Sequence, residues 1–450
     1  LAFAATTDDG ASGKNAYLHL VLPLAGHEVS SIGALYINDE RIEPVALPEE
    51  WMAPAASSRF SNPTAGAPPF IQWQCRLGTP DQLALRGLFL RVPGWGEQPR
   101  LRGVAYLYAQ LYYSSTVWGG GLPNLSAIVR GRKVYDPRTG LTGWSDNPAL
   151  IIRDYLLAPF GLACEADEID EDSFVAAAML CEERVPVTGR SEQKRYSCNG
   201  VFALDEKPIE IVEHLLSSCG GTLVYSEGRY RLYPAAFRTP ILSLGAGHLR
   251  DEVTVRPLPP RSERPNTVRG TFVDPARGWQ QTDFTPVADS TALSADNGLV
   301  IARDHDFAFT TDASMAQRLA QLQLRRARHA LTVGFPATLA ALPVTVMEPL
   351  YLPLPQFGWQ EKVFTPVAWT LTPEGGIDLE LVEDDPALYS WDGGAVLDAA
   401  LPLPPLPDIY PAAPSLQLQD EVQQGEGGSS LRLVVEISGV ADVFINRIEV

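Results

Sequence analysis

Residues 101–113 have the sequence LRGVAYLYAQLYY, the strongest β-strand pattern in the chain. Alternate side chains of a strand point to opposite faces, so Tyr106, Tyr108 and Tyr112 share one face and the alanine and leucine side chains share the other. Both faces are largely apolar, which is typical of a strand inside a domain or an interface. We expect the tyrosines to be buried in a core or between subunits, because exposed rings beside leucines would form an adhesive patch.

Further strand patterns surround this segment. Residues 15–42, NAYLHLVLPLAGHEVSSIGALYINDERI, predict a β-meander with a turn at residues 38–40. Residues 70–76 and 83–92 predict two more strands. Together they predict an N-terminal β-domain over residues 1–116, which ends where VWGGGLPN, residues 117–124, indicates a loop. Trp118 in this loop is a further candidate for a core or a subunit interface.

The next segment changes from strand to helix patterns. Asn147 is placed to cap a helix over residues 147–157, and further helices are expected over 172–183 and from about 205 to 219. A hairpin is expected over 222–233. These elements predict an α+β domain over residues 117–236.

Residues 237–396 are predicted as a second β-domain that contains one long helix, from about Asp312 to Arg328. Arginines are concentrated in the C-terminal half of this helix, where positive charge interacts favourably with the helix dipole. We expect them on a solvated or salt-bridged face, with acids of a neighbouring subunit or passing DNA as alternative partners. These candidate interface residues are Arg318, Arg325, Arg326 and Arg328.

The C-terminal part has a different composition. Residues 397–414 are predicted as a linker, because LPLPPLPDIYPAAP at 401–414 is rich in proline and favours a stiff polyproline II connector. Residues 415–450 predict three strands, at 416–418, 431–437 and 443–450. A fibronectin-like sandwich needs about 100 residues. We therefore expect the start of such a domain and a chain that continues beyond it.

Composition and motifs restrict the function. The 450 residues include 35 Lys and Arg against 54 Asp and Glu, a net charge of −19, which disfavours a protein that wraps nucleic acid. No stretch is long and apolar enough for stable membrane insertion, and no signal peptide is visible. P-loop, dinucleotide, nucleophile-elbow and HExxH motifs are absent. We expect no enzyme, no catalytic residues, no cofactor and no metal.

Three clusters leave alternatives open. The acids of residues 165–172 could supply the carboxylate pair of a glycan hydrolase, although their position before a helix favours a capping role. Residues 304–306, Asp-His-Asp, have metal-ligand side chains but need a third group from elsewhere. Exposed rings of Trp95 or Trp118 would suit a module that binds glycans of the host surface, whereas a core or interface position is favoured.

Four segments, in their order and spacing, resemble the tip attachment (host specificity) proteins of long, non-contractile-tailed phages and the related baseplate hubs of gene transfer agents. The likeness covers most of residues 18–391. The segments are VRGRKVYDPRTG (129–140) with WSDNPALIIRDYLLAPFGLA (144–163), RYSCNGVF (195–202) with LLSSCGGTLVYSEGRYRLYPAA (215–236), NTVRGTFVDPARGWQQTDF (266–284), and FGWQEKVFTPVAWTLTPEGGIDLELVEDDPALYSW (357–391).

This resemblance implies a mainly β, multi-domain structural protein of the virion, made in the host cytoplasm, with an α+β insertion. Such hubs form a homotrimeric ring that closes the tail tube and takes part in host attachment and DNA ejection. The implied partners are the distal tail ring protein, the tape measure protein, a tail fibre or fibre-associated proteins, and a host receptor reached through the missing C-terminal part. DNA would only pass through, and the acidic balance suggests a lumen along which DNA slides.

Overall fold

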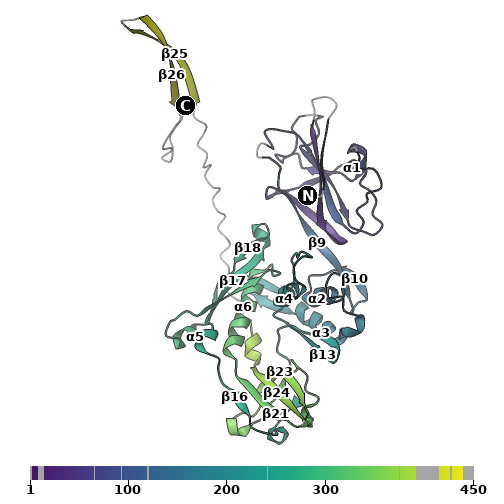
Figure 1. Ribbon diagram of the computed structural model, residues 1–450, viewed down its shortest axis with the longest axis vertical. Helices are drawn as coiled ribbons and strands as arrows, with labels where there is room; N and C mark the ends of the chain where they lie inside the picture. The colour runs from purple at the N-terminus through teal and green to yellow at the C-terminus, as the bar shows by residue number, and fades with distance from the viewer. Residues whose placement is uncertain are drawn as a thin grey trace. The chain divides into compact units, whose positions relative to one another are not determined.

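The computed structural model describes residues 3–8, 15–64, 66–92, 94–118, 121–240, 242–373 and 375–391, and the backbone of 415–425 and 428–438. The chain forms two compact units, Leu1–Ala395 and Val396–Val450 (Figure 1). The predicted connector at 401–414 lies outside the described residues. The predicted fold class, mainly β with helices in the middle of the chain, is confirmed.

Two antiparallel sheets pack face to face at the start of the first unit and are called the N-terminal sheets below. The larger has the strand order β1 (Phe3–Thr7), β2 (Tyr17–Ala25), β8 (Ala105–Tyr112), β7 (Ile71–Leu77), β6 (Met52–Pro54) and β5 (Pro44–Ala46). The smaller has the order β10 (Leu141–Trp144), β9 (Leu125–Asp136), β3 (Val29–Ile37) and β4 (Glu40–Ile42).

β8 separates two apolar cores. Leu107, Ala109 and Leu111 face the core between the two sheets, whereas Tyr106 and Tyr108 face a second core on the outer side of the large sheet. Residues 105–111 are all buried, as expected for a strand that is apolar on both faces.

Two sequence predictions for this region are wrong. Residues 15–42 do not form one meander, because β2 pairs with β1 and β8 in one sheet while β3 pairs with β4 and β9 in the other. Residues 83–92 contain helix α1 (Arg86–Arg91) rather than a strand. The helix covers the outer core with Leu85, Leu88 and Val92, whose spacing of three and four places them on one helix face.

The middle of the chain contains three helices around a single core. They are α2 (Pro148–Leu157), α3 (Glu171–Glu182) and α4 (Pro208–Ser217), joined by the hairpins β11–β12 (Arg184–Val187, Arg190–Lys194) and β13–β14 (Thr222–Ser226, Arg229–Tyr233). The predicted cap is present, since Asn147 Oδ1 accepts a hydrogen bond from the backbone N–H of Ala149 at 3.0 Å.

A small sheet continues this core. β17 (Thr267–Asp274) pairs antiparallel with β18 (Gln280–Asp283) and β19 (Val287–Ala288), and parallel with β20 (Ala302–Phe307) after the short helix α5 (Ser290–Ala295). Gly270 has a φ of 152°, and a Cβ there would lie 1.7 Å from the carbonyl oxygen of His305. Only glycine therefore allows β20 to approach β17 this closely.

The long helix α6 (Ala313–Arg328) packs on β17 and leads into a further six-stranded sheet, which occupies the lower part of Figure 1. Its strand order is β15 (Leu242–Ser243), β22 (Leu350–Tyr351), β23 (Val363–Thr372), β24 (Gly376–Asp384), β21 (Thr332–Ala337) and β16 (Thr254–Arg256). A separate core belongs to this sheet, built around Val333, Phe335, Phe364 and Leu381.

The second unit contains one antiparallel hairpin, β25 (Ser415–Gly425) with β26 (Gly428–Ser438). Two of the three predicted C-terminal strands, 416–418 and 431–437, lie within it. The third, at 443–450, lies outside the described residues, and the fibronectin-like domain stays a prediction.

The outer core of the N-terminal sheets contains a buried histidine. The imidazole of His19 on β2 lies 2.8 Å from the hydroxyl of Thr7 on β1 and 2.8 Å from the hydroxyl of Tyr108 on β8. Burial, with a smaller contribution from the positive charge of Arg91, lowers the pKa of His19 from 6.5 to about 4. The folded protein therefore keeps this ring neutral.

We predict that acid loosens the β1–β2–β8 part of this sheet. Because the folded pKa of His19 lies below the unfolded value, its contribution to stability is complete above pH 6.5 and is lost as the pH falls towards 4. The expected loss is about 2 kcal/mol of local opening free energy. Hydrogen exchange of the β2 and β8 amides, corrected for intrinsic rates, measures it. His19→Gln should be less stable at pH 7 but should lack this slope, and an unchanged slope in that variant would contradict the assignment.

Candidate functional site

Helix α6 brings together the arginines that the sequence singled out. Asp312 caps it, accepting a hydrogen bond from the backbone N–H of Met315 at 3.0 Å. The predicted stripe of Met315, Leu319 and Leu322 is buried against the central core. The helix is thus fixed along its length, and its arginines project from a rigid element.

Arg318 is the most buried of the four. Its guanidinium donates a hydrogen bond to the backbone carbonyl of Arg195 and lies over the rings of Tyr196, at 5.6 Å, and Trp391, at 5.7 Å. Burial lowers the pKa of Arg318 to about 10, while nearby Tyr196 acts in the opposite direction. The side chain still carries its positive charge at neutral pH, so it joins α6 to the segment that follows β12.

Arg325 and Arg326 hold the end of the described first unit. Arg325 Nη1 donates to the carbonyl oxygens of Ala387, at 2.9 Å, and Ser390, at 2.6 Å. Arg326 lies over the ring of Tyr389 at 5.7 Å, and its Nη1 donates to the carbonyl of Gly220 at 3.1 Å. These contacts therefore hold residues 386–390 against the last turns of α6. Most of these residues form the short helix η8 (Pro386–Tyr389).

Arg328 connects α6 to the start of β17. Its Nε donates to the carbonyl of Pro265 at 2.7 Å, and its Nη2 forms an ion pair with Asp296. Hydrogen bonds from Asn266 and Arg328 hold the pKa of Asp296 below its ordinary value. The carboxylate therefore stays charged as a fixed acceptor for the guanidinium.

We call these four arginines and their acceptors the arginine clamp. All four guanidinium groups bind backbone carbonyls of the same chain, in segments far from α6 in sequence. A guanidinium offers five N–H donors in a planar fork, so a single side chain can satisfy several carbonyls. The clamp therefore anchors distant segments of the chain to one helix.

The aromatic candidates lie in or beside the N-terminal cores. Tyr106 and Tyr108 are fully buried within the chain, whereas Tyr112 is half-buried with its ring 5.3 Å from that of Tyr17. The half-buried ring of Trp118 stacks on Phe60 at 5.6 Å, and its Nε1 donates to the carbonyl of Tyr112 at 2.9 Å. Only Tyr112 and Trp118 keep surface that another subunit could cover.

The acidic run ahead of α3 has structural contacts. Asp170 accepts hydrogen bonds from the backbone N–H of Ser173, at 3.1 Å, and from Arg231 Nε, at 2.9 Å. Burial raises the pKa of Asp170, but these bonds outweigh it and the net pKa is lowered. Glu171 pairs with Arg153. The lowered pKa of Asp170 does not suit a general acid, which needs a raised pKa.

The remaining alternatives find little geometric support. The ring of Trp95 packs edge-on against Phe3 at 4.9 Å, and Asp304 pairs with Arg269 while His305 stacks on Phe307. Among the residues that the structure describes, no group of three or more His, Cys, Asp or Glu is placed to hold a metal ion. Nor is any helix in this part of the chain long and apolar enough to cross a membrane.

Sequence reasoning missed the acceptors of the clamp. The segment 384–391, DDPALYSW, contains an Asp-Pro start signal for a short helix, and Asp385 does accept a hydrogen bond from the backbone N–H of Ala387 at 2.7 Å. That signal was available, but no sequence pattern indicates which carbonyls a distant arginine will bind.

We predict that Arg325→Ala loosens residues 386–391. The variant loses the donors to Ala387 and Ser390, so the local opening free energy should fall by about 1–3 kcal/mol. Hydrogen exchange of this segment measures the loss, with Arg303→Ala on β20 as a matched control. Arg325→Lys should restore only part of the protection, because an ammonium lacks the planar fork. Unchanged exchange in Arg325→Ala would be inconsistent with the clamp.

Comparisons with known proteins point to one class. Residues 207–360, which include α6, match a family described as a putative phage tail protein. Over 310 residues the chain is 23% identical to the baseplate hub protein pb3 of Escherichia phage T5, covering 64% of this chain and 32% of that protein. A chain in the virion of a native gene transfer agent particle has a similar fold, with a TM-score of 0.59, 16% identity and coverage of 87% of this chain and 83% of that one.

The chain spans about a third of the length of the curated relative it matches. The predicted location in a virion tail agrees with all three comparisons. The resemblance predicted from the sequence is confirmed: residues 207–360 match a phage tail protein family, and 310 residues of the chain are similar to a baseplate hub protein.

Proposed function

We propose that this chain, as a homotrimer, forms the central hub of a tail tip that closes the tail tube. It would join the distal tail ring protein and the tape measure protein on one side to a tail fibre or fibre-associated proteins on the other. In this position it takes part in host attachment and in DNA ejection, with receptor contact made by a C-terminal extension.

The observation that supports this function most directly is the likeness to the T5 baseplate hub protein over 310 residues. A hub must bind several neighbours at once and keep its own shape under load. The chain suits this task because it combines several β-sheets with separate cores, and rigid helices between them.

The arginine clamp fits the same role. A C-terminal extension that bears a fibre would pull on the end of the first unit. There Trp391 Nε1 donates to the carbonyl of Pro186 at 3.0 Å, and Arg325 holds Ser390. Tension would thus pass into strand β11 through Trp391 and into α6 and the central core through Arg325.

DNA passage is compatible with the charge of the chain. The net charge of −19 favours surfaces that repel the phosphate backbone, so DNA would slide through rather than bind. A lumen lined mainly by arginine and lysine in the assembled ring would contradict this part of the proposal.

Deletion of the gene in the parent phage or particle tests the hub role. We expect tails that lack a closed tip, fail to adsorb or eject, and recover when the chain is supplied in trans. Electron microscopy should place a labelled chain at the distal end of the tail. Tails with complete tips and normal ejection in the absence of the chain would overturn the proposal.

A further inference from the structure

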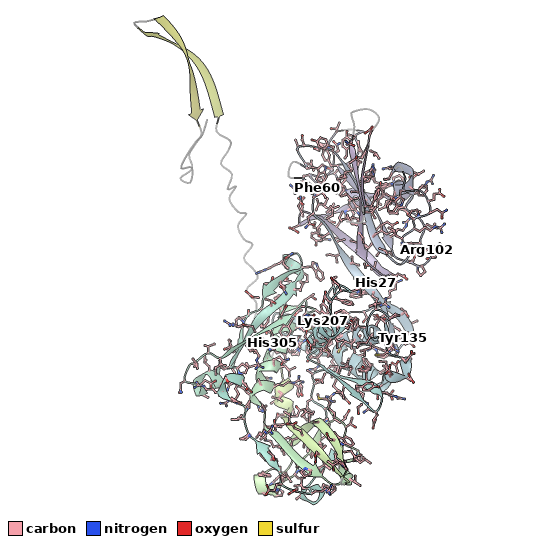
Figure 2. The ribbon with its side chains drawn as sticks, viewed as in Figure 1. His27, Phe60, Arg102, Tyr135, Lys207 and His305 are labelled. Atoms are coloured by element: carbon pink, nitrogen blue, oxygen red, sulfur yellow. The ribbon has the colours of Figure 1, made fainter. Side chains whose placement is uncertain are left out.

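A polar pocket lies where the N-terminal sheets meet the central helices. Strands β9 and β10, the residues around the start of α2 and the end of α3 form its walls, and Lys194 of β12 completes them. Its volume is about 310 Å³, at the lower end of the range of small-molecule sites. Figure 2 labels Tyr135, whose neighbours Val134 and Asp136 on β9 line the pocket. We call it the β10 pocket.

Trp144 at the end of β10 gives the pocket an aromatic surface. The guanidinium of Arg130 lies 5.1 Å from the centre of its ring, a cation–π contact that helps to hold the indole in place. The side chain of Trp144 is nevertheless 40% exposed, so part of the indole is available to a ligand. It differs in this from Trp95 and Trp118, whose rings pack on Phe3 and Phe60.

One wall of the pocket is a fixed network of charged groups. Arg138 donates to Asp136 Oδ2 at 2.8 Å and to Glu182 Oε2 at 2.7 Å. Asn147 Nδ2 donates to the second oxygen of Glu182 at 3.1 Å. Hydrogen bonds from Arg138 are the main cause that lowers the pKa of both Asp136 and Glu182. The wall is therefore charged at neutral pH, and its geometry is set before a ligand arrives.

The opposite wall keeps unused hydrogen-bonding capacity. Lys194 Nζ donates to Asp146 Oδ1 at 2.7 Å, but an ammonium has three donors and a carboxylate accepts at both oxygens. Ser145 Oγ accepts a hydrogen bond from the backbone N–H of Asn147 at 3.1 Å, and its own O–H has no acceptor among the residues described here. Both donors and acceptors are thus available to a ligand.

We propose that the β10 pocket binds one pyranose unit of a polysaccharide, with Trp144 as its stacking surface. A hydroxyl group both donates and accepts hydrogen bonds, so neighbouring sugar hydroxyls match the carboxylate of Asp146 beside the ammonium of Lys194. The C–H groups on one face of a pyranose ring are weakly positive and pack on the negative face of an indole. Arg138 and its two carboxylates would act as positioning residues that keep the pocket open.

The charges of the pocket favour a neutral ligand rich in hydroxyl groups. Three carboxylates and two cations line it, so a phosphate or a nucleic acid would meet an excess of negative charge. An apolar segment of another protein would remove five charged side chains from water without replacing their hydrogen bonds. Sugar hydroxyls replace those bonds. The choice of polysaccharides of the host cell as the source rests on the proposed function.

Two substitutions alter the pocket without touching its charged groups. Gly143 lies on β10 and lines the pocket, and a Cβ there would meet no atom within 4 Å. Gly143→Val therefore adds bulk without a clash, and valine favours strands. Trp144→Ala removes the indole. Trp279→Ala is the matched control, because Trp279 is 42% exposed and does not line the pocket.

Calorimetric titration of the full chain tests the proposal. The two probes are soluble surface polysaccharide and soluble peptidoglycan strands, both prepared from the host of the parent phage or particle. We expect the wild type and Trp279→Ala to bind one of them, which identifies the source of the ligand. Trp144→Ala and Gly143→Val should each bind at least about tenfold more weakly. Circular dichroism checks that every variant is folded.

A wild type that binds neither probe, or folded Trp144→Ala and Gly143→Val chains that bind as the wild type does, would overturn the proposal. Incorporation into tails separates it from the hub function. A chain that enters tails but binds neither polysaccharide overturns the sugar site alone, whereas a chain that binds but is absent from tails overturns the hub function alone. Folded Gly143→Val chains that keep full polysaccharide binding but no longer enter tails would assign the pocket to a neighbouring tail protein instead.

Discussion

Burial of positive charge on α6 is the constraint on which much of the first unit depends. A guanidinium removed from water is costly unless its N–H groups find acceptors, and a charged donor forms stronger hydrogen bonds than a neutral one. Arg325 and Arg326 donate to the carbonyls of Ser390 and Gly220. Arg318 donates one N–H to the carbonyl of Arg195, while its Nε is left without a partner among the described residues. Each bond requires a different segment to lie at one helix, so the helix fixes their relative positions. Because its arginines find carbonyl acceptors within the fold, α6 can be both strongly basic and largely buried.

The N-terminal sheets depend on a different constraint. β8 is apolar on both faces, and no single layer could cover it, so a second sheet covers one face and α1 covers the other. On the tyrosine face, the hydroxyl of Tyr108 is hydrogen-bonded inside the core. His19 bridges Thr7 and Tyr108 and so links the edge strand β1 to the central strand β8. Sheet order and the buried hydrogen bonds are therefore consequences of one two-sided strand.

Local features of the sequence predicted the helices well and the strand pairings poorly. The caps of α2 and α6 are Asn147 and Asp312, and both helices begin where these residues indicate, because a cap acts within a few residues. The pairing of β2 with β8 and of β3 with β9 joins residues about 90 apart, and no local pattern contains that choice. Residues 83–92 predict a strand but contain helix α1. Some of their apolar residues alternate and others recur at i, i+3, so the pattern fits both a strand and a helix. The candidate arginines were found from their helix, whereas their carbonyl acceptors became visible only in the fold.

The arginines of this chain fall into two groups, and the division bears on how copies meet. Those on α6 have their donors occupied by carbonyls and by Asp296, so recruiting them to a neighbouring subunit would require breaking contacts that hold the chain together. The side chains of Arg86, Arg100 and Arg102 make no such contacts among the residues that the structure describes. A new ion pair with them costs no internal hydrogen bond, although it must still offset the desolvation of both charges. The arginines of the long helix are therefore expected to keep their contacts within the chain.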